Sequence, residues 1–217
     1  MKLYSYFLSS AAFRVRIALA LKKVDYDTVP VHLMKNGGEH KSPDYQTINP
    51  QQLVPALDDN GFVLTQSLAI IEYLEDRYPQ IPLLPDDVQE RAWVRAAAYL
   101  VACDIHPLDN LRVLNYLKND LNVNDEQKQT WYAHWITQGF GALETLMLER
   151  YPGDTPRKFC YGDTPTMADC CLIPQVYNAK RFNVDLSKFP NIVAIYEHCI
   201  SLPAFIQASP KAWADLV

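Results

Sequence analysis

Residues 4–22 read YSYFLSSAAFRVRIALALK, and this stretch decides how the fold begins. An aromatic, apolar run ends at two adjacent serines, and a helical pattern starts at once. The pattern predicts a strand from Leu3 to Phe7 and a helix from Ser10 to Lys23. A serine oxygen just before a helix accepts a hydrogen bond from one of the first backbone N–H groups. One serine is enough for that cap, so the pair asks for a second explanation.

Composition predicts an ordinary soluble globular protein. The chain has 217 residues, 49% of them hydrophobic, and a formal net charge of -5, which suits one large domain or two small ones. Without a basic patch, we expect neither nucleic acid nor a membrane surface as a partner. The start of the chain has no secretory signal pattern and no apolar stretch is long enough to span a bilayer, so we expect a cytoplasmic protein.

Five cysteines stand at positions 103, 160, 170, 171 and 199. They form no C-x-x-C pair, and an odd number with two adjacent members suits reduced thiols better than a disulfide framework. Free cysteine usually packs as a small hydrophobic residue. We therefore expect structural packing, with no metal site and no redox role.

The first eighty residues alternate between strand and helix patterns. A second strand is predicted from Tyr26 to Leu33, which completes a βαβ unit. Because proline cannot donate to the ladder, Pro30 implies that this strand lies at a sheet edge or carries a bulge. A short helix follows at Ser42–Pro43. The remaining elements are a hairpin, LVPAL and FVLT around the turn DDNG, and an amphipathic helix, SLAIIEYLEDRY.

A proline-rich segment, PQIPLLP at 79–85, marks a composition shift that favours an extended linker. We expect a first domain over 1–80, a linker over 81–87 and a second, all-helical domain over 88–217. In that domain the periodicity predicts helices over 88–118, 126–150, 166–179 and 190–200. Thr166 to Asp169 reads as a capping box, which gives Asp169 a role in folding.

The paired serines stand where a helix end can stabilise an anion, since its free N–H groups and the positive end of its dipole converge there. Thioredoxin-like proteins place a C-x-x-C motif at this junction, but Ser9-Ser10-Ala11-Ala12 contains no sulfur. If sulfur chemistry occurs here, the sulfur must come with a ligand. Arg14 and Arg16, further along the helix, are expected to form ion pairs at the domain interface rather than to bind substrate.

The hairpin adds a second set of candidates. Val54 precedes Pro55 at the start of an apolar strand, so its backbone groups can pair with an extended ligand, and the sequence leaves open whether this bond is cis. Gln66 and Ser67 open the next helix, either as a cap or as a site for a ligand carboxylate. Two helix N-termini beside an open strand edge suit a short anionic peptide.

The whole chain resembles a cytosolic glutathione transferase of the zeta class, in its bacterial maleylacetoacetate isomerase branch. The motifs that carry the resemblance span both predicted domains: SSAAFRVRIALALK, NPQQLVPAL, QSLAIIEYLEDRYP, IHPLDNLRVL, TMADCCLIPQVYNAKRF and VDLSKFPNI. The resemblance implies a thioredoxin-like N-terminal domain of order βαβαββα, an all-helical C-terminal domain, a homodimer and glutathione as cofactor.

The resemblance also implies roles for individual residues. Ser9 and Ser10 match the serines beside the glutathione sulfur, with Ser9 stabilising the thiolate, and Ala11 stands where the family has cysteine. His40 matches a contact to the glycyl end, Val54 the backbone partner of the cysteinyl moiety, and Gln66 with Ser67 the binders of the γ-glutamyl group.

A second set of matches lies in the predicted helical domain. His106, Asn110 and Arg112 match a stretch that lines the glutathione site, in the same or the partner subunit, and Arg181 matches a position facing the substrate. His106 and Asn110 are four residues apart and share a helix face, and Pro107 implies a kink. Without the resemblance, His106 reads as an exposed helix residue and Arg112 as a surface charge. Leu8 departs from the family, which has arginine there.

The resemblance implies glutathione-dependent cis–trans isomerisation of maleylacetoacetate to fumarylacetoacetate, a step of tyrosine and phenylalanine catabolism, by reversible thiolate addition. Arginine suits such a dicarboxylate substrate because its planar fork binds carboxylates in a bidentate manner. Two alternatives share the thiol chemistry: a maleylpyruvate isomerase, and a transferase that conjugates small electrophiles such as haloacids. A third is a binding module without chemistry, which would not need the thiol site.

Overall fold

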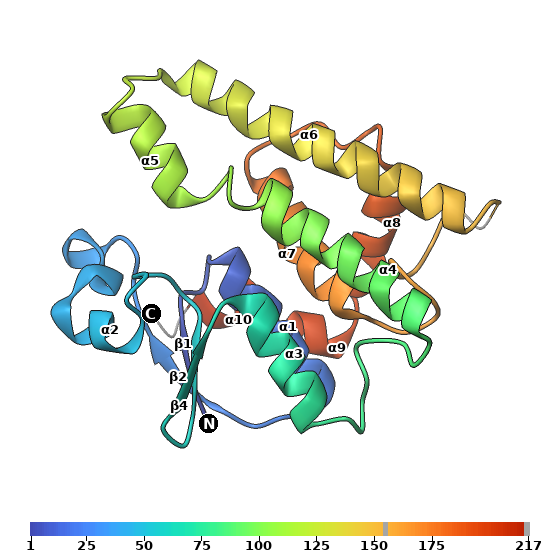
Figure 1. The fold of residues 1–217 in the computed structure, drawn as a ribbon. Helices are drawn as coiled ribbons and strands as arrows, with labels where there is room; N and C mark the ends of the chain where they lie inside the picture. The colour runs from blue at the N-terminus through green and yellow to red at the C-terminus, as the bar shows by residue number, and fades with distance from the viewer. Residues whose placement is uncertain (154–155, 215–217) are drawn as a thin grey trace. The chain divides into compact units, whose positions relative to one another are not determined.

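The protein is described here by a computed structural model of residues 1–153 and 156–214. The chain forms two compact units. The first contains Met1–Leu83 together with the residues from Ser201 onward, and the second is Leu84–Ile200. Figure 1 shows the elements of both units, most of the helices and strands with their labels.

A mixed four-stranded sheet of order β2-β1-β3-β4 forms the centre of the first unit. Its strands are β1 Lys2–Ser5, β2 Asp27–Pro30, β3 Ala56–Asp59 and β4 Phe62–Thr65. Strand β1 pairs in parallel with β2 and antiparallel with β3, which pairs antiparallel with β4. The predicted place of Pro30 on an edge strand is confirmed.

Three helices of this unit cover the sheet: α1 Ser10–Lys22, α2 Pro43–Ile48 and α3 Ser67–Arg77 (Figure 1). Side chains of a strand alternate between its faces. Ser5 points toward α1, since its Oγ accepts a hydrogen bond from Arg16 Nη1 at 3.0 Å. Tyr4 points the other way and meets Tyr45 of α2, with the ring centroids 6.0 Å apart. Helices α1 and α2 therefore lie on opposite faces.

The end of the chain packs against α1 in the same unit. Helices α9 Pro203–Ala208 and α10 Pro210–Trp213 belong to the first unit. From the sequence we expected these residues in the helical domain over 88–217. Arg16 Nε donates to the Ala208 carbonyl at 2.9 Å, and its guanidinium lies 5.5 Å from the centroid of the Trp213 ring. These contacts join residues far apart in sequence, so helical periodicity could not reveal them.

Arg16 does not form the expected ion pair within the described residues. Its guanidinium donates to Ser5 Oγ and to the carbonyls of Tyr6, Phe7 and Ala208. The side chain is completely buried, and burial lowers its pKa to about 10. Carbonyl oxygens satisfy the guanidinium without burying a second charge.

Lys22 and Glu75 form a buried ion pair that ties α1 to α3. The Lys22 Nζ lies 2.6 Å from Glu75 Oε2 and donates to the carbonyls of Tyr78 and Ile81 at 2.9 Å. Glu75 in turn accepts from the Leu83 N–H. The pair fixes the proline-rich segment as it leaves the first unit.

The second unit is helical in its described residues. Its main helices are α4 Val88–Tyr99, α5 Leu111–Asn119, α6 Asp125–Arg150, α7 Met167–Arg181 and α8 Pro190–Cys199. Helix α4 continues as a wider π-helical segment, η3 Leu100–Ile105. The continuous helix predicted over 88–118 is thus wrong, since residues 106–110 form a turn between η3 and α5 (Figure 1). Pro107 lacks the N–H that a continuing helix needs.

Buried carboxylates cap two helices of this unit. Asp169 accepts from the N–H groups of Cys160 and Thr166 at 2.8 and 2.7 Å, in agreement with its expected structural role. Glu144 accepts from the N–H groups of Asn191 and Ile192 at the start of α8. All five cysteines are free, and every one except Cys103 is buried, as packing predicts. Among the described helices none is long and apolar enough to cross a membrane.

Candidate active site

The two serines stand at the N-terminus of α1. Ser9 is the N-cap in an extended conformation, and its Oγ accepts a hydrogen bond from the Ala12 N–H at 3.2 Å. Ser10 is 5% exposed and Ala11 is half-buried. A hydroxyl that accepts the capping bond keeps its own hydrogen for another acceptor. The first turn of α1 contains no acidic residue, so the positive end of its dipole is available to an anion.

Gln66 and Ser67 form a second helix end of this kind, at the start of α3. Gln66 occupies the N-cap position but forms no capping bond, and its φ of 71° is unusual for a residue other than glycine. Its Nε2 donates instead to Gln51 Oε1 at 2.7 Å. Strained backbone that persists in this way often marks a functional site. The first turn of α3 also has no acidic residue.

Arg14 connects the two helix ends. It lies one turn after Ser10 on α1, is 2% exposed, and donates through Nη1 to Ser67 Oγ at 3.2 Å. The structure thus brings the beginning of α3 close to the first turns of α1. Sequence reasoning assigned Arg14 to an ion pair at the domain interface and missed this contact. The spacing of four residues between Ser10 and Arg14 was a signal that they share a helix face.

The segment before β3 is held by side chains of α2 and of Asn49, its C-cap residue. The Tyr45 hydroxyl and Asn49 Nδ2 both donate to the Leu53 carbonyl at 2.7 Å. The Val54–Pro55 bond, which the sequence left open, is cis. The Val54 side chain is 8% exposed and belongs to an apolar cluster. Its position is therefore fixed by packing within the first unit.

His40 lies in η2 Glu39–Lys41, a short 3-10 segment before α2. It packs against Gly38, where an added Cβ would lie only 2.5 Å from His40 Cε1. The His40 Nδ1 is buried and has no hydrogen-bond partner among the described residues. Burial, followed by the charge of Lys41, lowers the His40 pKa. A half-buried neutral imidazole can still bind a polar ligand group through its other ring nitrogen.

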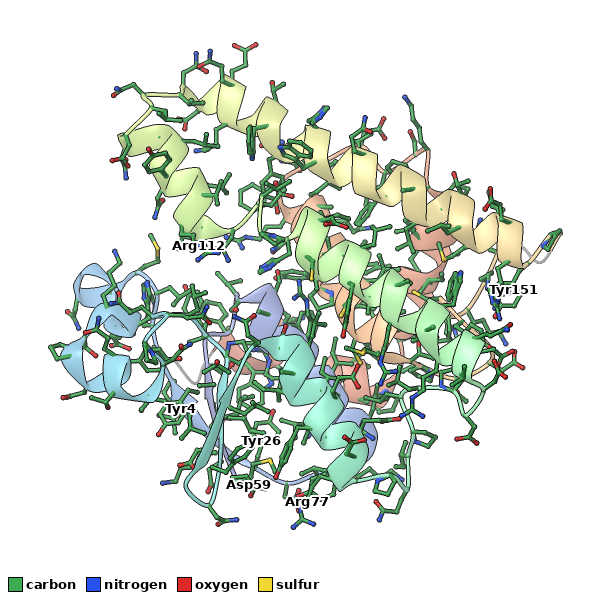
Figure 2. All side chains as sticks on the ribbon, viewed as in Figure 1. Tyr4, Tyr26, Asp59, Arg77, Arg112 and Tyr151 are labelled. Atoms are coloured by element: carbon green, nitrogen blue, oxygen red, sulfur yellow. The ribbon has the colours of Figure 1, made fainter. Side chains whose placement is uncertain are left out.

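The predicted residues of the second unit lie in the turn after η3 and at the end of α7. Asn110 is the N-cap of α5, and its Oδ1 accepts from the Arg112 N–H at 3.1 Å. His106 is half-buried at the start of the turn, and Arg112 is exposed at the beginning of α5 (Figure 2). Arg181 is exposed at the end of α7, with its guanidinium 5.2 Å from the centroid of the Phe182 ring.

One acidic residue of this turn escaped the sequence reasoning. Asp109 is 8% exposed, and neither of its carboxyl oxygens has a hydrogen-bond partner among the described residues. Burial raises its pKa to about 8. Tyr132 of α6, also buried, interacts electrostatically with both Asp109 and Arg181, so this turn lies near the end of α7. The only sequence signal for Asp109 as a site residue was its position between His106 and Asn110.

Comparison with known sequences identifies the two parts of the chain. The family model described as glutathione S-transferase, N-terminal domain, matches residues 1–76. The model described as glutathione S-transferase, C-terminal domain, matches residues 129–198. The maleylacetoacetate isomerase of Pseudomonas aeruginosa is 49% identical over 99% of this chain and 98% of its own length.

Solved structures agree with this assignment. A maleylpyruvate isomerase described as a bacterial glutathione S-transferase of the zeta class matches 98% of each chain with a TM-score of 0.92 and 47% identity. The maleylacetoacetate isomerase of Methylobacterium extorquens AM1, solved with bound malonate and glutathione, matches 97% of this chain and 96% of its own with a TM-score of 0.88 and 38% identity. The chain therefore belongs to the glutathione S-transferase family, in the zeta-class branch that contains the maleylacetoacetate and maleylpyruvate isomerases.

Proposed function

We propose that this protein is a glutathione-dependent cis–trans isomerase that converts maleylacetoacetate to fumarylacetoacetate. The observation that carries the proposal is the 49% identity to the Pseudomonas aeruginosa maleylacetoacetate isomerase over nearly the whole of both chains. The geometry supports it, because the first unit presents two helix N-termini without acidic residues, each with a serine hydroxyl. Such ends suit the thiolate and the carboxylate of glutathione.

In the proposed reaction, bound glutathione supplies a thiolate that adds reversibly to the cis double bond of the substrate. The Ser9 hydroxyl donates a hydrogen bond to the sulfur, while its oxygen continues to accept from the Ala12 N–H. This bond and the α1 dipole lower the thiol pKa from its reference value of about 8.5 toward neutrality. Ser10 and Ala11, the first residues of α1, complete the site around the sulfur.

The remaining contacts position glutathione along the first unit. Gln66 and Ser67 bind the γ-glutamyl group, the Val54 backbone pairs with the cysteinyl moiety, and His40 contacts the glycyl end. From the second unit, we assign His106, Asn110 and Arg112 to the glutathione site. The start of α3, which has no side-chain cap, fits these assignments.

Arg112 and Arg181 are the proposed anchors for the substrate carboxylates. Both side chains are exposed, and arginine binds carboxylates through paired N–H groups. A maleylpyruvate isomerase is the second candidate function, because a protein of that name matches this chain with a TM-score of 0.92. Leu8 stands where the resemblance implies a further arginine, so the two keto acids are compared directly.

An absorbance time course with maleylacetoacetate, run with and without a catalytic amount of glutathione, tests the function. We expect substrate loss only with glutathione, fumarylacetoacetate as product and a constant thiol titre, because the thiol is returned in each cycle. Thiol consumed in step with substrate would establish conjugation instead. A parallel series with maleylpyruvate compares kcat/KM for the two acids. If the protein does not bind immobilised glutathione, the third alternative, a binding module without chemistry, is favoured.

We also propose that the protein acts as a homodimer in the cytoplasm, as its family implies. Light scattering should then give a mass near twice the 24.8 kDa of one chain. A mass of one chain at micromolar concentration would contradict the dimer, and recovery from the membrane or extracellular fraction would contradict the location.

A further inference from the structure

Arg14 is a buried cation, and one of its contacts lies at the start of α3. The side chain is 2% exposed, and its Nη1 donates to Ser67 Oγ at 3.2 Å. Ser67 is itself 5% exposed and is the first residue of α3. Burying a guanidinium is costly unless it is paired and hydrogen-bonded. One hydrogen bond of Arg14 goes to a serine that we propose as a ligand contact.

The direction of this hydrogen bond matters for a ligand. Arginine has only donors, so the Ser67 oxygen must accept, and the hydroxyl hydrogen of Ser67 cannot be used on Arg14. That hydrogen is left to donate to an acceptor outside the bond. The positive charge behind the oxygen polarises the hydroxyl and makes it a better donor to an anion.

The start of α3 offers an anion further donors. Gln66 makes no side-chain capping bond and its side chain is bound to Gln51, so no side chain at the N-cap position occupies the first N–H groups of the helix. A ligand carboxylate placed there meets helix N–H groups, the Ser67 hydroxyl and, behind the hydroxyl, the charge of Arg14. These three contributions favour the ionised form of the carboxylate.

Arg16, two residues further along α1, shows that a buried arginine here need not serve a ligand. It is completely buried, and its donors are satisfied by Ser5 Oγ and by main-chain carbonyls of the first unit. Its role is therefore to join the end of the chain to α1. The two arginines share a helix and a chemistry but differ in their partners, which makes Arg16 a matched control.

We propose that Arg14 is a positioning residue for the γ-glutamyl carboxylate of glutathione, acting through Ser67. It fixes the Ser67 oxygen so that the hydroxyl hydrogen faces the ligand, and it places a positive charge behind that hydroxyl. This inference rests on the proposed glutathione-dependent function and adds to it a residue that touches neither the sulfur nor the substrate.

The test compares two thiols by calorimetry: glutathione, and its analogue in which 4-aminobutyrate replaces the γ-glutamyl residue and so removes only the α-carboxylate. We expect wild type to bind glutathione about tenfold or more tightly than the analogue, as a charge-assisted hydrogen bond implies. Arg14→Gln should lower the affinity for glutathione about tenfold and change the affinity for the analogue by no more than about twofold. Arg14→Lys, which keeps the charge, should recover part of the loss.

Arg16→Lys, with circular dichroism to check folding of every variant, separates positioning from structure. We expect it to change the affinities of both thiols by the same factor or not at all. If Arg14→Gln and Arg14→Lys lower the affinities for both thiols by the same factor, Arg14 is a structural residue and the proposal is wrong. The proposal is also wrong if Arg14→Gln binds glutathione as tightly as wild type. If wild type binds neither thiol, the glutathione-dependent function itself is wrong, and the role of Arg14 falls with it.

Discussion

Replacing Ser9 with alanine is expected to reduce kcat/KM for isomerisation about 100- to 1000-fold, the usual cost of removing one donor to a reacting anion. The affinity for glutathione should stay within about threefold of wild type, because the γ-glutamyl and glycyl contacts remain. The physical reason is the single free hydrogen on the Ser9 hydroxyl, whose oxygen is engaged by the Ala12 N–H. Without that donor the bound thiol should also titrate at a higher pH, which the ultraviolet absorbance of the thiolate reports.

A loss of stability must be separated from a loss of chemistry, since Ser9 also caps α1. Removing a serine cap costs about 1 kcal/mol. Ser42→Ala is the matched control: Ser42 caps α2, and its Oγ accepts from the Tyr45 N–H at 3.2 Å, as Ser9 accepts from Ala12. We expect the two variants to lose similar stability and only Ser9→Ala to lose turnover. Near-normal turnover in Ser9→Ala, with a large loss in Ser10→Ala, would transfer the role to Ser10.

Asp109 is expected to make the protein less stable as the pH rises from about 4 to about 8. The buried carboxyl has a pKa of about 8, raised from 3.8 by burial, so the folded state holds a proton that the unfolded state has already lost. The unfolded state thus binds fewer protons over this range, and the free energy of unfolding falls by at most about 1.4 kcal/mol per pH unit. Partial access of water to this turn screens the effect, and we expect a total of about 2–4 kcal/mol.

Asp109→Asn tests this expectation, because the amide has the same shape and does not ionise. Urea unfolding at intervals from pH 5 to pH 9 should give a flatter stability profile for the variant and an advantage over wild type that grows up to about pH 8. Asp120→Asn, at the exposed C-terminal end of α5, is the control and should follow wild type. Parallel profiles for wild type and Asp109→Asn would show that Asp109 is ionised in the folded state throughout.

Asp109 also bears on the site, since its neighbours in the turn are proposed ligand contacts. The Asp109 N–H donates to the His106 carbonyl at 3.2 Å, and the Leu108 carbonyl accepts from Trp131 Nε1 at 2.9 Å. A charge on Asp109 would have to be buried against Tyr132, whose hydroxyl has no partner among the described residues. Ionisation therefore strains the segment that leads to Asn110 and Arg112.

The order of elements and the two helix N-termini could be predicted from sequence because local interactions determine them. Ser9 accepts the capping bond from Ala12 and Ser42 accepts it from Tyr45, each a contact between residues three apart. Pro30 similarly restricts its own strand to an edge, since the missing N–H is a property of that residue alone.

The tertiary structure alone decided which distant residues meet. Arg14 finds Ser67 across 53 positions and Arg16 finds Ala208 across 192, and neither partner is implied by any periodicity. Three other features were also not implied by local sequence: the break in the predicted helix 88–118, the packing of α9 against α1 and the burial of Asp109. Each depends on which surfaces pack together and exclude water, and this is a property of the assembled core. Local sequence determined where helices and strands begin, while packing determined which side chains they bring into contact.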